Sequence, residues 1–282
     1  MVQPKWIIEH IFDDHTDQLV QSLKKMGVDH KVISDAAQYN TDWKELYSPE
    51  ECVVTHGSIQ FGNLVQRYTK WIPGHICADD NYKCSYFYPK FGDLLLNSNF
   101  IMLPYGCLVD KTDFIFEVMG IQDAIFIRPD GGKKSFSGMI TYKENFEKDF
   151  GLMGFYDEVK PESICVISNP RNLVGEWRLQ IVNDKVITGS KYKEWNAGLY
   201  QAKFSRVKED SPEFKYAEKV LQEVKYAPDI AWCLDICQTK EGELYVLETG
   251  SFSSAGVYDV DTDKLVEAIN KAAIEEWEEY QV

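Results

Sequence analysis

The stretch AIFIRPDGGKKSFSG, residues 124–138, changes character within a few positions. An apolar run ends at Arg128, and a polar loop follows at once. This loop contains Gly131, Gly132, Ser135, Ser137 and Gly138. The run predicts a buried strand, and the loop offers many backbone N–H groups beside a fixed cation, which is the combination that a polyphosphate requires. The loop matches neither standard phosphate-binding glycine pattern, and a charged hairpin loop explains it equally well.

The composition sets limits on the function. A chain of 282 residues with 44% hydrophobic residues can bury a sizeable core, which we expect to form two units. The net charge of −15 and the lack of a basic stripe argue against nucleic-acid binding. The seven cysteines are scattered without paired spacing, so we expect reduced thiols and a cytoplasmic protein. We find neither a signal peptide nor an apolar run near 18 residues, and therefore expect no membrane association.

The two halves of the chain show different patterns. The first third predicts a small open α/β sheet, with a ligand-binding edge near the turn His56-Gly57-Ser58 or, alternatively, a plain turn there. Residues 71–107 are rich in aromatics and show no clear period. Strands between 124 and 250 are mostly joined by hairpins, with turns at 183–184 and 241–242, and helices are predicted over 209–226 and 261–280. This half is predicted to be an antiparallel α+β unit.

Two acids lie within apolar strands of one predicted hairpin. Asp235 is in WCLDIC and Glu248 in YVLETG, and a turn at 241–242 makes them near cross-strand neighbours. A carboxylate in such surroundings is costly unless it is paired or bound to a cation. Magnesium would relieve the repulsion between the two and leave coordination positions for water and phosphate oxygens. Salt bridges to lysine or arginine are the alternative.

A further strand carries a mixed pair of charges. In GEWRLQIVNDKVITGSKYK, Glu176 and Arg178 are two residues apart and therefore on one face. Lys191 and Lys193 lie beyond the opposite strand of the same hairpin. Arg178 can therefore point toward the same binding site as Arg128, although a surface ion pair of little energetic value is the alternative.

The order of these motifs resembles the ATP-grasp ligase superfamily. The likeness covers most of the chain and is closest to the clade with arginine in place of a phosphate-binding lysine, common among phages and bacteria, which the FSSAGVY segment also resembles. It implies an N-terminal pre-ATP-grasp α/β domain over 1–107, a lid subdomain over 108–162 and a large subdomain with the metal site over 163–282.

The resemblance also implies roles for individual residues. Arg128 takes the place of the phosphate-binding lysine, residues 131–138 form the lid loop, and Glu176 and Arg178 match an E-x-R strand. Asp235 and Glu248 would hold Mg²⁺. The backbone of a hinge strand over 164–168 would meet adenine, with Cys165, Val166 and Ile167 as its binding residues. Lys191, Lys193 and the Gly57-Ser58 turn are candidates for contacts to ATP or to the substrate carboxylate.

The resemblance implies an ATP-dependent ligase that joins a carboxylate to an amine through an acylphosphate. Its substrates would be small molecules or peptides, and the protein could form a homodimer. One departure is the closing motif, where Glu248-Thr249-Gly250 replaces the usual Glu-x-Asn, so that Ser251 or water would have to substitute or metal binding would weaken. A regulatory ATP-binding module and a kinase-like phosphotransferase are the alternatives.

Overall fold

The structure is a computed structural model that describes residues 2–11, 13–34, 41–132, 135–153, 159–196 and 199–281. The chain forms two units. The first comprises Met1–Ala78, Val174–Leu244 and Glu248–Val282, and the second comprises Asp79–Leu173 and Tyr245–Leu247. The predicted boundaries at 107/108 and 162/163 follow a different division, and the three domains stay a prediction.

A parallel sheet in the order β2-β1-β3-β4 opens the first unit. Its strands are β1 (Lys5–His10), β2 (His30–Ser34), β3 (Cys52–His56) and β4 (Ile72–Gly74), and its helices are α1 (Asp13–Lys25), α2 (Trp43–Leu46) and α3 (Ile59–Tyr68). Alternate residues of β1 face opposite sides, because side chains alternate along a strand. Trp6 and Ile8 join one core cluster and Ile7 another. The predicted α/β sheet is therefore confirmed.

The first unit also contains a five-stranded sheet in the order β11-β10-β9-β12-β13. Its strands are β9 (Leu173–Val182), β10 (Lys185–Asn196), β11 (Leu199–Arg206), β12 (Ala231–Thr239) and β13 (Leu244–Ser251). Asn183 and Asp184 both have positive φ, 45° and 58°, as a two-residue hairpin turn requires, so the predicted turn is confirmed. Strand β11 is a strand that the sequence did not predict, and all of its residues are exposed.

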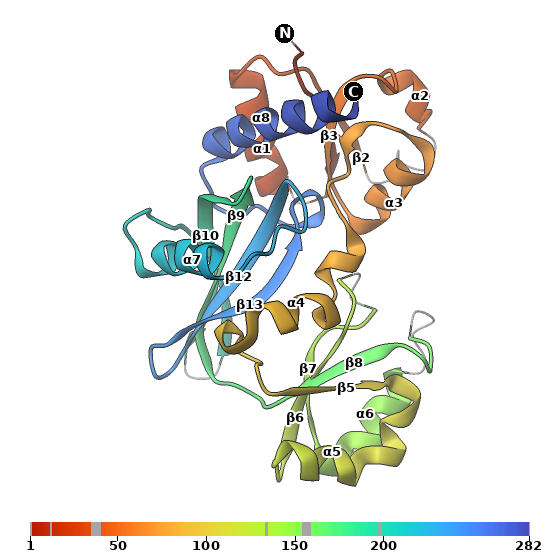
Figure 1. Cartoon of the computed structure of the whole chain (residues 1–282), viewed down its shortest axis with the longest axis vertical. Helices are drawn as coiled ribbons and strands as arrows, with labels where there is room; N and C mark the ends of the chain where they lie inside the picture. The colour runs from red at the N-terminus through yellow and green to blue at the C-terminus, as the bar shows by residue number, and fades with distance from the viewer. Residues whose placement is uncertain are drawn as a thin grey trace. The chain divides into compact units, whose positions relative to one another are not determined.

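Two helices complete the first unit. These are α7 (Pro212–Glu223) and α8 (Thr262–Tyr280), within the two helical segments predicted from the sequence. Helix α8 lies beside α1, as Figure 1 shows, and Ser22 hydrogen-bonds Thr262 and Asp263 at its start. The apolar face of α8 therefore packs on the Trp6 and Ile8 side of the parallel sheet.

The second unit has an antiparallel sheet in the order β5-β8-β6-β7. Its elements are α4 (Cys84–Phe91), β5 (Phe100–Pro104), α5 (Thr112–Met119), β6 (Ala124–Pro129), β7 (Met139–Tyr142), α6 (Phe146–Met153) and β8 (Ile164–Ser168). Helices α5 and α6 cover one face, where Ile125, Ile127 and Ile167 are buried (Figure 1). The mixed fold class predicted from the sequence is confirmed. No helix within the described residues is long and apolar enough to span a membrane.

Candidate functional site

A buried ion pair joins two adjacent strands of the first unit. Arg178 of β9 donates from Nε to Oδ1 of Asp235 on β12 at 2.8 Å, and from Nη2 to Oδ2 at 2.7 Å. Asp235 is 1% exposed, and Nη1 of Arg178 donates to the carbonyl of Gly256 at 3.2 Å. The salt bridge that the sequence left open for Asp235 is therefore present, and its partner is the arginine of the GEWR strand.

Glu176 completes this cluster of charges. Its Oε2 accepts a hydrogen bond from the Tyr192 hydroxyl at 2.8 Å, and its Oε1 lies 3.1 Å from Lys193 Nζ. The Trp195 indole N–H also donates to Oε1, at 3.3 Å. The Tyr192 oxygen is 3.3 Å from Asp235 Oδ2, so one hydroxyl lies between two buried carboxylates. We call Glu176, Arg178, Tyr192 and Asp235 the β-sheet cluster.

Aromatic rings enclose the β-sheet cluster on one side. Tyr258 stacks on Tyr192 at 5.1 Å between centroids and on Phe204 at 5.3 Å, and the Arg178 guanidinium lies 5.2 Å from the Tyr258 ring. Tyr258 has φ of 59°, an unusual backbone conformation for a bulky residue. The loop Gly256-Val257-Tyr258 thus fixes the guanidinium through a carbonyl and a ring.

The surroundings shift the pKa values of the β-sheet cluster. Burial raises the pKa of Tyr192 well above its usual value, and the charges of Asp235 and Glu176 add to this effect. Burial alone would lower the pKa of Arg178, but the Asp235 carboxylate outweighs it and holds that pKa above its usual value. Tyr192 is therefore a neutral hydrogen-bond donor and Arg178 a permanent cation.

Lys191 and Lys193 engage different partners. Lys191 donates to Glu194 at 2.8 Å, and Lys203 donates to the same carboxylate at 2.7 Å. These two lysines lower the pKa of Glu194 to about 2. A cavity of about 360 Å³ is lined by Val174, Trp177, Lys191, Glu194, Trp195 and Gln238. Lys193 instead contacts Glu176, so only Lys193 belongs to the surroundings of the β-sheet cluster.

Glu248 lies on β13, the strand next to β12. It is half-buried, and its charge contributes to the raised pKa of Tyr258 and Tyr192. Among the described residues, no group of three or more His, Cys, Asp or Glu side chains is arranged to hold a metal ion. Asp235 and Glu248 supply hard oxygen ligands, and each Asp235 oxygen keeps a lone pair beyond the Arg178 bond. This donor set fits Mg²⁺ that is also held by phosphate oxygens.

The second unit places Arg128 beside the predicted hinge strand. Arg128 of β6 is the direct cross-strand partner of Val166 on β8. Cys165 and Ile167 face the opposite side, within the core under α5 and α6. Strand β8 pairs with β5 on its other edge, so its backbone lies between two strands. Whether this segment contacts adenine stays a prediction.

The predicted lid loop is described only in part, since Lys133 and Lys134 lie outside the described residues. Its start is anchored by Asp130, which accepts hydrogen bonds from the Ser85 backbone and hydroxyl at 2.6 and 2.8 Å. A Cβ at Gly131 would meet nothing, whereas one at Gly138 would lie 2.8 Å from the Phe126 ring. Phosphate contacts by Gly131, Gly132, Ser135, Ser137 and Gly138 stay predictions.

The Gly57-Ser58 turn is occupied by a carboxylate. The Ser58 N–H donates to Oε2 of Glu9 at 2.6 Å, and the Ser58 hydroxyl accepts from Phe61 N–H at the start of α3. A second carboxylate would be repelled here by the first. The prediction that this turn binds a substrate carboxylate is therefore wrong.

Sequence reasoning missed several residues that organise the first unit. The segment after β13 is attached to the parallel sheet by Ser251, which donates to Ile76 O at 2.7 Å, and by Ser253, which donates to Thr55 O at 2.7 Å. His56 hydrogen-bonds the Ala255 carbonyl at 3.0 Å. The only signal in the sequence was the serine-rich segment SFSSAGVY itself. It links the parallel sheet to the carbonyl that Arg178 uses.

This fold and cluster define an ATP-grasp protein. The sequence matches a family described as an ATP-grasp domain, the second family of its clade, over residues 112–268, which is more than half of the chain. The protein belongs to this family, and the resemblance drawn from the sequence is confirmed. No curated protein matches the chain in sequence.

Solved structures share the fold at low identity. The ATP-grasp ligase PsnB, complexed with a minimal precursor, has a TM-score of 0.58 at 12% identity, covering 98% of this chain and 99% of that one. D-cycloserine synthetase DcsG has a TM-score of 0.62 at 9% identity, with coverage of 96% and 99%. D-alanine–D-alanine ligase from Bacillus anthracis has a TM-score of 0.56 at 13% identity, with coverage of 99% and 100%. At these identities the likeness concerns the fold.

Proposed function

We propose that the protein is an ATP-dependent ligase that joins a carboxylate to an amine. The observation that carries the proposal is the buried Arg178–Asp235 pair on adjacent strands, with Glu248 on the next strand, in a chain of the ATP-grasp family. Such a pair keeps an arginine rigid and fully charged, which suits stabilisation of a transferring phosphoryl group. The three fold relatives named above are ligases or synthetases by name, which supports this reaction class.

The proposed reaction has two steps. A substrate carboxylate oxygen attacks the γ-phosphorus of ATP, the bond to the bridging oxygen breaks, and ADP leaves. A neutral amine then attacks the acyl carbon of the acylphosphate. The acyl C–O bond breaks, inorganic phosphate leaves with its electron pair, and the nitrogen loses a proton to give the amide. Neither step requires a protein nucleophile, so positioning and charge neutralisation carry catalysis.

In the first unit, Arg178 would donate hydrogen bonds to the transferring phosphoryl group. Its face is fixed by Tyr258 and its Nε and Nη2 by Asp235, so the remaining N–H groups have a defined direction. Glu176 holds Tyr192 and Lys193 in place. Lys191 and Lys193 remain candidates for the substrate carboxylate or for ATP.

Magnesium would be held by Asp235 and Glu248 and would neutralise phosphate charge when it binds with ATP. PsnB has also been solved with Mg and ADP, which supports the same ligands here. In the second unit, Arg128 would contact phosphate oxygens. Its position beside Val166 would bring it near the adenine if the predicted hinge role of that strand holds.

Thermal unfolding tests nucleotide binding first. A ligand that binds only the native state raises the melting temperature, so ATP with Mg²⁺ should raise it, while Mg²⁺ alone or ATP with a chelator should not. ADP release should then require both a carboxylic acid and an amine in a screen of amino acids and short peptides.

Each other outcome identifies another function. ADP release with an alcohol alone would indicate a phosphotransferase. A nucleotide-dependent shift without turnover on any acceptor pair would indicate an ATP-binding module. No shift at millimolar nucleotide would contradict the proposal and all ATP-dependent alternatives.

A further inference from the structure

Glu9 stands out among the acids of the first unit because it is fully buried at the carboxyl end of a parallel strand. It lies on β1, near the end of that strand, and its exposure is 0%. Strand β1 is central in the sheet, between β2 and β3. Open α/β sheets bind ligands beyond the carboxyl ends of their strands. Glu9 is therefore placed where this fold class binds substrates.

Only one of the two carboxylate oxygens has a partner. Oε2 accepts the Ser58 N–H at 2.6 Å. Oε1 is buried, and the described part of the chain supplies it with neither a hydrogen bond nor an ion pair. A buried carboxylate oxygen without a donor is costly, since it loses its hydration and gains nothing in return. Unpartnered buried groups of this kind call for a specific explanation.

Stabilising the start of α3 does not explain this arrangement. The Ser58 hydroxyl already accepts the Phe61 N–H at 3.0 Å, which is the usual capping bond. One uncharged acceptor would serve the Ser58 N–H equally well. The chain is also adapted to bring the turn close to the acid, since a Cβ at Gly57 would lie 2.7 Å from Glu9 Cβ and 2.8 Å from its Oε2.

The neighbouring histidine does not supply a positive charge. His56 precedes this turn on β3, and Ile8 is its direct partner on β1. Burial lowers the pKa of His56 to about 4, so that its ring is neutral near pH 7. Its Nε2 is engaged with the Ala255 carbonyl at 3.0 Å. The negative charge of Glu9 is thus left for a ligand to neutralise.

We infer that Glu9 is a binding residue for a substrate ammonium group, with Oε1 as its hydrogen-bond acceptor. This inference rests on the proposed function and names the part of the chain that would select the amine substrate. A primary ammonium offers three N–H donors and a positive charge, which is what Oε1 lacks. The net charge of −15 would also favour the approach of a cationic substrate over an anionic one.

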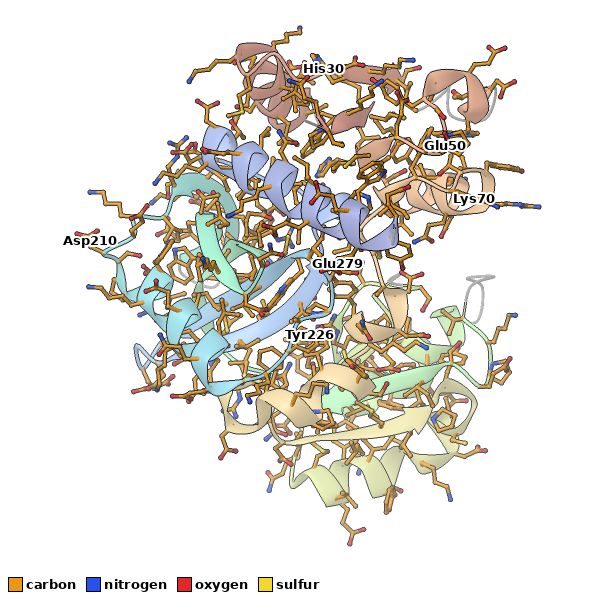
Figure 2. The ribbon with its side chains drawn as sticks, turned by 45° about the horizontal axis from the view of Figure 1, so that its top comes forward. His30, Glu50, Lys70, Asp210, Tyr226 and Glu279 are labelled. Atoms are coloured by element: carbon orange, nitrogen blue, oxygen red, sulfur yellow. The ribbon has the colours of Figure 1, made fainter. Side chains whose placement is uncertain are left out.

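The test is binding of amines to the full chain and to Glu9→Gln. Glutamine still accepts the Ser58 N–H, so a purely structural role at the turn survives, while the charge that attracts an ammonium is lost. Thermal unfolding is followed with methylammonium, glycinamide and 1,4-diaminobutane, each compared with its fully N-acetylated derivative. Glu50→Gln is the matched control, since Glu50 is exposed in the same sheet region and is labelled in Figure 2.

We expect at least one primary amine to raise the melting temperature of the wild type and of Glu50→Gln, and its acetylated form to have no effect. Glu9→Gln should bind the same amine roughly ten-fold more weakly or worse, as loss of a charge-assisted hydrogen bond implies. An unchanged shift in Glu9→Gln, or no amine-dependent shift in the wild type, would overturn the inference.

The effect of ATP with Mg²⁺ on the same variants separates this inference from the proposed function. Glu9→Gln should keep the nucleotide-dependent shift of the wild type. A wild type that responds to amines but not to nucleotide would refute the ligase and leave the ammonium site standing. A response to nucleotide but not to amines would do the reverse.

Discussion

Asp235 and Glu9 are both acids buried in strands of the first unit, with 1% and 0% exposure, yet their surroundings differ completely. Asp235 receives two hydrogen bonds from Arg178, and the Tyr192 hydroxyl lies 3.3 Å from it. Glu9 receives one backbone N–H, and its Oε1 has no partner within the described residues. Equal burial thus accompanies one carboxylate that the fold satisfies and one that it leaves incomplete.

The difference separates two uses of a buried charge. A carboxylate with all of its donors supplied by the chain fixes another group in place, as Asp235 fixes Arg178. A carboxylate with an empty acceptor position is costly in the free protein and becomes favourable when a ligand supplies the donor. Substitutions at and around the two acids measure how far this distinction holds.

The largest effect should follow Asp235→Asn. The amide removes the negative charge and leaves the Arg178 guanidinium buried without a counter-charge, which costs about 3–5 kcal/mol of unfolding free energy. Urea unfolding of the variant measures this loss. Glu248→Gln, at a half-buried acid on the next strand, serves as the control and should lose much less. A loss below about 1 kcal/mol in Asp235→Asn would show that the pair does not hold Arg178 in the native state.

The sequence predicted that Asp235 needs a cation, but not which one. Local signals were sufficient for the hairpins, because the turn Asn183-Asp184 and apolar alternation act over a few residues. The Arg178–Asp235 contact depends on β9 lying beside β12, and strand order is not encoded locally. Glu9 was concealed for the same reason, since its strand was read as apolar and its partner Ser58 is 49 residues away.

The stretches that escaped prediction lack an alternating pattern. Strand β11 is exposed along its whole length, so no residue type marks an inward face. Strand β5 and helix α4 come from the aromatic stretch 71–107, where rings such as Tyr88 and Phe100 pack edge to face at 4.9 Å between elements. Aromatic content reports burial there without reporting secondary structure.

A pH series sharpens the contrast by testing whether His56 is neutral near Glu9. Its pKa is lowered from 6.5 to about 4 by burial. The unfolded chain therefore binds more protons than the native one between these values, and the contribution of neutral His56 is present above pH 6.5 and lost as the pH falls to about 4. The full loss is roughly 3 kcal/mol.

His56→Gln removes this pH dependence, since glutamine can still donate to the Ala255 carbonyl without titrating. We expect the unfolding free energy of the variant to fall less steeply than that of the wild type between pH 6.5 and 4, as measured by urea unfolding at each pH. His30→Gln, at a labelled position in Figure 2, controls for the loss of a histidine. Parallel wild-type and His56→Gln curves would mean that His56 is charged near Glu9.

Tyr192→Phe probes the satisfied acid from the other side. The change removes the hydroxyl that donates to Glu176 at 2.8 Å and retains the ring stacked on Tyr258. Glu176 is 4% exposed and keeps Lys193 and Trp195 as donors, so we expect a loss of about 1.5 kcal/mol in thermal or urea unfolding. Tyr200→Phe, at an exposed ring, should change stability by less than about 0.5 kcal/mol. Equal effects of the two variants would remove Tyr192 from the β-sheet cluster.

The smallest change in stability should follow Glu9→Gln, although it is the same chemical replacement as Asp235→Asn at an equally buried position. The amide keeps the acceptor for the Ser58 N–H and is less costly to bury than a carboxylate with one empty oxygen, so the unfolding free energy should stay equal or rise by about 1 kcal/mol. Urea unfolding of both variants in one buffer makes the comparison direct. A loss in Glu9→Gln as large as that in Asp235→Asn would mean that the fold itself depends on the Glu9 charge. Buried acids would then divide by position in the sheet and not by the completeness of their hydrogen bonds.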